Sequence, residues 1–274
     1  MREGAFKKYS KKTLIYAFLI IMSFISVFPL YWAFISSSNT TAEILGGKMI
    51  PGGHLIENIK NLFAQQDVVG AFKNSCINTG IVLVLSLITC SIAGYGFEVY
   101  HDKGKDMVMG ALMMSMMVPF VAVLVPLFQM FTSMGLVNKA MGFVLPSIST
   151  PFLIMLFRNN ARNFPREIIE AARMDGLNEL QIFIRMFIPT MRPTYAAAAT
   201  ITFMNTWNAY LWPKVVLQTA NSNTMPMLVA NLMGGYVIDY GVVMAGVTIC
   251  TLPTVIIFFI LQKSFTEAIA GSVK

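Results

Sequence analysis

Charged and very small side chains alternate within one polar stretch of the chain, residues 163–189. Its segment Glu170–Arg173 reads Glu-Ala-Ala-Arg, and Asp175 and Gly176 follow one residue later. Carboxylate and guanidinium groups form strong charge-assisted hydrogen bonds, and alanine side chains let a second surface come close. The pattern predicts docking of a partner protein rather than a covalent reaction.

No other residues suggest a catalytic or metal centre. His54 and His101 lie far apart in polar segments, and Cys76, Cys90 and Cys250 sit in apolar stretches without a CxxC spacing. Cysteines in such surroundings act as small apolar residues. The sequence also lacks HExxH and the GxxxxGK[ST] loop that holds nucleotide phosphates. We therefore expect no catalytic residue, metal or cofactor on this chain.

The composition is that of a membrane protein. Charged residues make up 12% of the chain, whereas soluble domains have about 25%. The formal net charge of +7 could suggest nucleic acid, but such binding requires basic residues gathered on one solvated face. Here they flank apolar runs, so we expect a lipid environment and no nucleic acid.

A bilayer core of about 30 Å requires about 20 apolar residues per helix. Six runs approach this length, which predicts an all-α membrane protein with six transmembrane helices. They are Leu14–Ile35, Ala71–Phe97, Met107–Ser133, Met141–Phe157, Thr194–Trp212 and Gly241–Leu261. The first run is longer than a cleavable signal and lacks a clear cleavage site. We expect a short N-terminal segment, residues 1–13, followed by one transmembrane domain, residues 14–274.

The basic residues predict the orientation of these spans. With the N-terminus inside, fifteen of the 20 lysines and arginines fall in cytoplasmic segments. Lysine and arginine accumulate in short cytoplasmic loops. Both termini and the loop of residues 158–192 are therefore expected in the cytoplasm.

The spans contain no group suited to ion coupling. Acidic residues near them fall at span ends or in loops: Glu98, Asp102, Asp106, Asp239 and Glu267. Ion-coupled carriers usually bear ionisable groups at membrane depth. A secondary carrier is therefore the more distant alternative, and an external energy source is favoured.

Within the spans, glycines and prolines predict local features. Glycines permit close approach of helix backbones, which we expect at Gly80, Gly94, Gly110 and Gly246. Prolines at depth kink or break helices where neighbours or a cavity satisfy the backbone.

The polar stretch should fold as a helix, a turn and a second helix. Pro165 suits a helix start and Gly176 suits the left-handed residue that ends one, which predicts a helix near Pro165–Asp175. Asn178 and Gln181 have the spacing of a capping box. A second helix should then run along the membrane surface to Pro189. Its apolar face would contain Leu180, Phe183, Ile184 and Phe187.

Three short sequences in this loop resemble the EAA signature of binding-protein-dependent ABC importer permeases. They are Glu170-Ala171-Ala172, Asp175-Gly176 and Ile188-Pro189. The run Trp207–Pro213 and the tail residues Gln262–Phe265 and Ala270–Gly271 are similar to carbohydrate-uptake permeases of the maltose G-subunit type. The resemblance covers nearly the whole chain.

The resemblance implies a type I ABC importer permease fold in the bacterial inner membrane. One half of the pathway would come from this chain and the other from a second permease subunit. A dimer of ATP-binding subunits would hold ATP and Mg²⁺. An extracytoplasmic binding protein would deliver a sugar, which we expect to be an oligosaccharide. Permeases for amino acids or peptides are the nearest alternative.

In that family the loop couples to the ATPase. The residues expected to do so are Glu170, Ala171, Ala172, Arg173, Asp175, Gly176 and Pro189. The tail, Thr266–Lys274, is implied to reach the ATPase interface, and the alternative is a frayed terminus.

Aromatic and amide side chains near the end of the fifth span could bind a sugar. Asn205, Trp207, Asn208 and Tyr210 combine flat apolar faces with hydrogen-bonding groups. Anchoring at the membrane interface explains Tyr210 equally well. In the maltose-type family the companion permease makes most sugar contacts.

The outer loop between the last two spans has a polar tip. Asn221, Ser222, Asn223 and Thr224 offer amides and hydroxyls without net charge, and we expect this tip to project outward. The resemblance implies contact with the binding protein. The apolar stretch Pro226–Gly235 should lie on the membrane or re-enter it.

Overall fold

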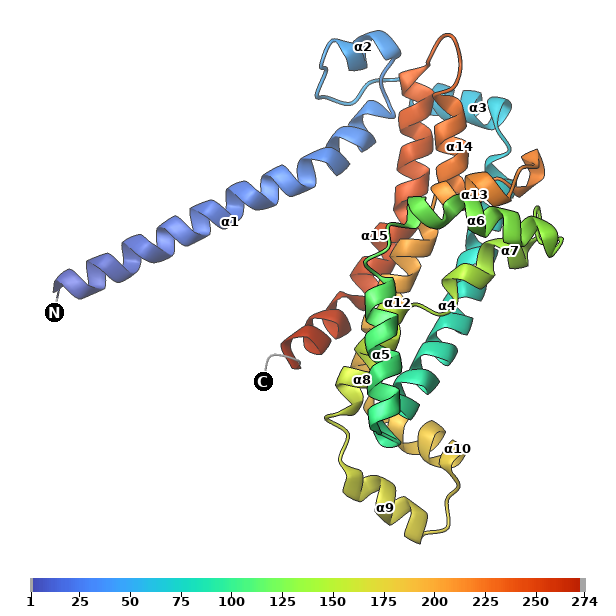
Figure 1. Cartoon of the computed structure of the whole chain (residues 1–274). Coiled ribbons are helices and arrows are strands. Elements are labelled where there is room, and N and C mark those ends of the chain that lie inside the picture. Colours follow the sequence, from blue (N-terminus) through green and yellow to red (C-terminus); the bar gives the residue numbers. More distant parts are fainter. Residues whose placement is uncertain (1, 272–274) are drawn as a thin grey trace. The chain divides into compact units, whose positions relative to one another are not determined.

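The computed structural model describes residues 2–271 and the side chains of residues 12–262, so the side chains of the tail lie outside the described residues. Every regular element in this range is helical, as predicted (Figure 1). The helices are α1 (Arg2–Ser36), α2 (Thr41–Leu45), α3 (Leu55–Gln65), α4 (Val68–Val99), α5 (Lys103–Ser115), α6 (Phe120–Ser133), α7 (Ala140–Val144), η1 (Leu145–Ser147), α8 (Pro151–Ala161), α9 (Arg166–Met174), α10 (Glu179–Ile182), η2 (Phe183–Phe187), α11 (Ile188–Thr190), α12 (Arg192–Trp207), α13 (Leu211–Val216), η3 (Ala220–Ser222), α14 (Met225–Leu232) and α15 (Tyr240–Gly271).

The chain divides into two compact units. The first comprises Met1–Gln66 and Val229–Cys250, and the second Asp67–Leu228 and Thr251–Lys274. In the first unit, Asn58 on α3 forms hydrogen bonds with the residues that follow the end of α1. Its Nδ2 donates hydrogen bonds to the carbonyl oxygens of Ser37 (2.9 Å) and Asn39 (3.0 Å), which satisfies carbonyls that a helix end leaves without partners.

In the second unit, α4 packs most extensively against α8 and α12. A Cβ atom placed on Gly94 would lie 2.5 Å from Phe157 Cβ and 2.8 Å from Arg158 N. The expected close approach at Gly94 is therefore confirmed, and it brings α4 directly onto α8.

The other three glycines give a mixed result. In the first unit, a Cβ on Gly246 would lie 3.2 Å from Leu232 Cδ1, so close packing is confirmed there. A Cβ on Gly80 or Gly110 would meet nothing within 4 Å in the described part of this chain, so neither glycine makes a close approach there.

Among the described residues, three helices are long and apolar enough to cross a membrane: Lys12–Ser36, Val68–Val99 and Tyr240–Gln262. Two bent helix pairs raise the number to five if each pair forms one span. The predicted span Thr194–Trp212 corresponds mainly to α12, whose 16 residues give a length of about 24 Å. That helix is shorter than a bilayer core, and α13 follows it after a break at residues 208–210.

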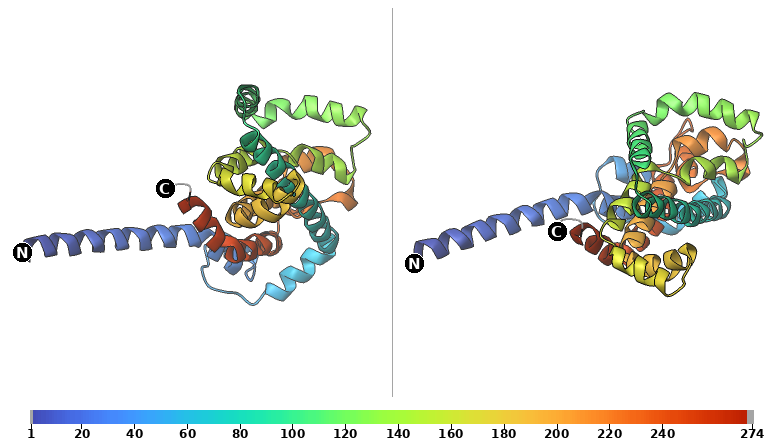
Figure 2. Two further views of the ribbon diagram at one scale, coloured as in Figure 1. Left: turned by 90° about the horizontal axis from the view of Figure 1, so that it is seen from below. Right: turned by 60° about the horizontal axis from the view of Figure 1, so that its bottom comes forward.

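The predicted span Met107–Ser133 is broken near Pro119, one of the prolines expected to interrupt a helix at membrane depth. It consists of α5 and α6, which meet at 101°, and Figure 2 shows the two green helices running in different directions. Pro119 precedes α6 with ψ 131°. Proline has no backbone N–H and disfavours helical geometry in the residue before it, so the helix ends here.

The predicted span Met141–Phe157 is also interrupted. The segment Ala140–Ser147 and α8 are bent by 44° at a short break before Pro151. The apolar stretch Pro226–Gly235 contains most of α14, where Met227 is buried with Val82 and Phe143.

We expect Gly94→Ala to lower the melting temperature of the purified protein. Overpacking costs about 1–3 kcal/mol, and the added methyl would overlap α8. Gly96→Ala is the matched control, because a Cβ there meets nothing within 4 Å and alanine favours a helix by about 1 kcal/mol over glycine. Equal melting temperatures for both variants would contradict the close packing of α4 and α8.

Candidate functional site

The loop of residues 163–189 folds as predicted around α9. Pro165 caps its start in an extended conformation (φ −61°, ψ 127°), and the helix begins one residue later than expected. Gly176 adopts φ +79°, a left-handed conformation that glycine reaches without strain. The chain therefore turns sharply between α9 and α10.

The start of the second helix is confirmed as well. Asn178 Oδ1 accepts from the backbone N–H of Gln181 (2.9 Å), and Gln181 Oε1 accepts from that of Asn178 (3.0 Å). Only half of the residues expected on its apolar face are buried. Phe183 and Phe187 are buried, but Leu180 and Ile184 are exposed, and the segment Phe183–Phe187 is a turn of π-helix.

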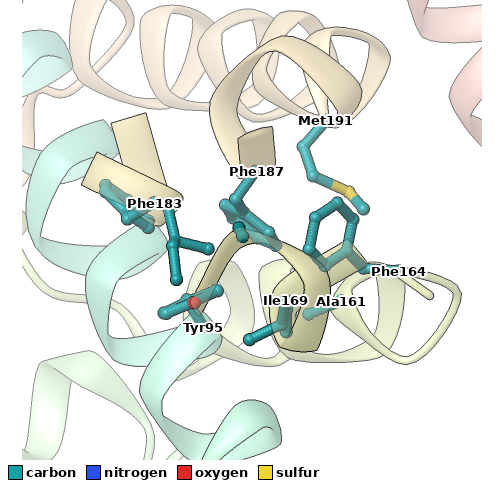
Figure 3. Packing of buried hydrophobic residues seen from close by; sticks show 9 residues of the cluster. Tyr95, Ala161, Phe164, Ile169, Phe183, Phe187 and Met191 are labelled. Atoms are coloured by element: carbon teal, nitrogen blue, oxygen red, sulfur yellow. The ribbon is translucent and has the colours of Figure 1, made fainter. Parts of the chain in front are cut away.

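The inner face of α9 is packed into an aromatic core. Ile169 and Ala172 are buried in a cluster with Tyr95 of α4, Phe164 and Phe187 (Figure 3). The ring centroids of Tyr95 and Phe187 lie 4.9 Å apart, edge to face. Ala172 thus packs against its own chain, because helical spacing directs it inward beside Ile169.

The outer face of α9 remains exposed. Glu170, Ala171, Asp175 and Gly176 are all on the surface, as docking requires. The most exposed apolar side chain of the loop is Met174, at 89%. Met174 is not among the docking residues predicted from the sequence. The signal was present, because Met174 is an apolar residue on the polar face of an amphipathic helix.

Arg173 holds the two helices of the loop together. Its Nε donates to Glu179 Oε1 across the turn (2.8 Å). This guanidinium lowers the pKa of the Glu179 carboxyl below its ordinary value, and a hydrogen bond from Tyr100 adds to the effect. Arg173 therefore has a partner within the chain, while Pro189 lies exposed near the end of the loop.

A hollow of about 220 Å³ opens beside α9. It is lined on one side by Arg166 and Glu170 and on another by Glu98 and Arg162. Neither Arg166 nor Glu170 has a hydrogen-bond or ion-pair partner in the part of the chain that the structure describes. Both are therefore available to side chains of a docked protein.

A buried arginine joins three helices just above this hollow. Arg158 of α8 is 5% exposed, and its Nε donates to Glu98 Oε2 of α4 (3.3 Å) while its Nη2 donates to Asp106 of α5. Arg162 also donates to Glu98 (3.3 Å), and His101 Nε2 lies 2.9 Å from Asp106 Oδ2. The sequence placed these residues at span ends but did not predict the network. The network joins segments up to 64 residues apart, which local sequence does not reveal.

The four residues expected to line a sugar pathway do not come together. Asn205 lines a hollow of about 530 Å³, but Trp207 is 2% exposed and stacks on Phe203 with centroids 5.6 Å apart. Side chains two positions apart along a helix, such as those of Asn205 and Trp207, lie on nearly opposite faces. Asn208 and Tyr210 are exposed beyond the end of α12.

The polar outer loop is hydrogen-bonded to α4. Asn74 Nδ2 donates to the carbonyl oxygens of Asn221 (2.8 Å) and Asn223 (3.0 Å). Asn221 is exposed, Ser222 and Asn223 are half-buried, and Thr224 is buried. The loop sequence alone does not reveal these partners, because they come from α4.

Comparisons with known proteins place the chain among transport proteins. Residues 88–270 match the family described as "Binding-protein-dependent transport system inner membrane component". The chain is 42% identical to the lactose transport system permease protein LacG of Rhizobium radiobacter, over 94% of this chain and 95% of that protein. It is 33% identical to the arabinooligosaccharides transport system permease protein AraQ of Halalkalibacterium halodurans, over 92% and 93%.

A solved structure shares the fold. It is that of a bacterial ABC transporter involved in the import of the acidic polysaccharide alginate. The TM-score is 0.82 at 21% sequence identity, and the match covers 93% of this chain and 96% of that one.

We expect Arg158→Met to lower the melting temperature substantially. Removing one partner of a buried ion pair costs about 3–5 kcal/mol, because Glu98 and Asp106 would lose their shared cation. Arg162→Met is the matched control on the same helix. Its side chain is 57% exposed, and exposed pairs contribute at most about 1 kcal/mol. A larger loss for the Arg162 variant would contradict the central place of Arg158.

Proposed function

The chain belongs to the family of binding-protein-dependent transport system inner membrane components, and we propose that it forms half of the translocation pathway of an ATP-driven importer for an oligosaccharide. It is a transport subunit and not an enzyme. The other half of the pathway is a second permease subunit. ATP and Mg²⁺ are held by a dimer of ATPase subunits.

The observation that carries the proposal is the two-faced helix α9. Its inner face is fixed in the aromatic core by Ile169, whereas its outer face presents Ala171 and the exposed thioether of Met174. Apolar contact with Met174 and ion pairs with Glu170 suit a protein surface of mixed character. We assign this outer face to the ATPase.

The assignment changes the set of coupling residues. Glu170, Ala171, Asp175 and Gly176 keep the proposed role, and Met174 joins them. Ala172 acts from inside the loop, and Arg173 braces it through Glu179.

The solute class is proposed from the relatives. The lactose and arabinooligosaccharide permeases are similar over nearly the whole chain, which favours a neutral oligosaccharide over an amino acid or a peptide. An extracytoplasmic binding protein delivers it. Of the four polar residues proposed to contact it, Asn221 is exposed and Ser222 and Asn223 are half-buried, whereas Thr224 is buried.

The proposed orientation places residues 1–13, the C-terminus and residues 158–192 in the cytoplasm. Lys103 and Lys105, near the start of α5, lie in the same compartment under this orientation. The arginine network at Arg158 then marks the cytoplasmic ends of α4 and α8.

We expect the chain to copurify with an ATPase whose hydrolysis is stimulated by a sugar-loaded binding protein, and reconstituted vesicles to take up oligosaccharides. Met174→Asp should reduce stimulation and uptake at least tenfold, because a charge replaces the apolar contact. Membrane insertion should be unchanged, since Met174 is exposed.

Met174→Leu is the matched control and should retain uptake. Gly176→Val should also abolish coupling, because a β-branched residue disfavours positive φ. Full transport by Met174→Asp would reject the docking face, and uptake of amino acids or peptides in place of sugars would reject the solute class.

A further inference from the structure

Two broken helices contribute to one hollow in the second unit. The break between α5 and α6 supplies Met116 and Phe120, and the break before α8 supplies Ser147 and Thr150. The hollow measures about 530 Å³, within the range of small-molecule sites, about 300–1,000 Å³. Interrupted helices at membrane depth are tolerated where they line a cavity, and in transporters they often frame the solute site.

The third wall is a polar face of α12. Thr202, Asn205 and Thr206 all line the hollow, and their spacing of three and four residues places them on one side of the helix. Thr202 is 5% exposed, and its Oγ1 has no hydrogen-bond partner among the described residues. A buried hydroxyl without a partner is destabilising, so a ligand that supplies a hydrogen bond would offset that cost.

The fourth wall is aromatic and rigid. Trp212 and Phe120 both line the hollow, with ring centroids 6.5 Å apart and nearly perpendicular. Trp212 is fixed in place because its Nε1 donates to the carbonyl oxygen of Gly142 (3.1 Å). Its ring also packs edge to face against Phe131, at 5.3 Å.

The lining has a definite chemical character. Its thirteen residues include hydroxyls, one amide and aromatic rings, and none of them is Asp, Glu, Lys, Arg or His. An ionic solute would enter without a counter-charge, which is costly at membrane depth. A sugar ring fits, since its apolar face can stack on aromatic rings while its hydroxyls bond to threonine and asparagine.

We propose that this hollow is a subsite for one uncharged sugar ring on this subunit, with Thr202 and Asn205 as hydrogen-bonding residues and Trp212 with Phe120 as the aromatic wall. The inference rests on the proposed function and deepens it in two respects. This chain contacts the solute itself, and it selects neutral over acidic sugars. Asn205 is the one residue shared with the pathway predicted from sequence.

The test uses the complete importer in vesicles, with lactose, arabinotriose and a galacturonate disaccharide as probes. Thr202→Val removes the hydroxyl at nearly constant shape. We expect it to raise the KM for the transported neutral sugar about 2- to 10-fold, the equivalent of one neutral hydrogen bond. The melting temperature should stay equal or rise, because an unsatisfied buried group is removed. Asn205→Leu should raise KM similarly.

Thr200→Val is the matched control. Thr200 lies on the same helix and donates to the carbonyl oxygen of Ala196 (2.8 Å), and it is absent from the lining of the hollow. Its variant should leave KM unchanged.

Stimulation of ATP hydrolysis by the binding protein distinguishes failure of the proposed function from failure of the subsite alone. If wild type shows no such stimulation, the proposed function fails and the subsite with it. If stimulation is intact but Thr202→Val and Asn205→Leu leave KM unchanged, only the subsite is rejected. Transport of the acidic disaccharide as efficiently as the neutral sugars would likewise overturn it.

Discussion

The burial of one face of α9 in an aromatic core is the interaction on which the rest of the loop depends. Ile169 and Ala172 lie against Tyr95 of α4 and against Phe187, which leads into α12. Closely packed interiors transmit displacement instead of absorbing it. A short loop helix, too short to be stable by itself, thereby becomes a rigid extension of the membrane helices. The same packing leaves the opposite face exposed for a partner.

Charged groups reinforce this arrangement unequally. The exposed pair Arg173–Glu179 spans the turn after α9, and such pairs contribute at most about 1 kcal/mol. Arg158 is buried and shared between Glu98 and Asp106, so losing it would leave Glu98 with only the exposed Arg162 and Asp106 with only His101. The aromatic core therefore holds α9 to α4, and Arg158 joins α8 to α4 and α5.

Sequence predicted the parts of the structure that local chemistry determines. Gly176 and the capping box at Asn178 were sufficient to place the turn and the second helix, and long apolar runs indicated the membrane helices. It failed where residues far apart in the chain decide the outcome. Pro119 indicates an interruption, but its local sequence does not give the 101° angle between α5 and α6. The burial of Thr224 and the network of Arg158 depend on α4 and could not be read from their own neighbourhoods.

The central claim is that α9 moves with the membrane helices as one body. A pair of spin labels at Glu167→Cys on α9 and Lys103→Cys at the start of α5 tests it most directly, with Cys76, Cys90 and Cys250 replaced by serine. Distances between the labels are measured by pulsed electron resonance in the complete importer, without ATP and with ATP trapped. The account predicts the same narrow distance distribution in both states. A shift of several ångströms or a broad distribution, with uptake retained, would show that α9 moves independently and would contradict it.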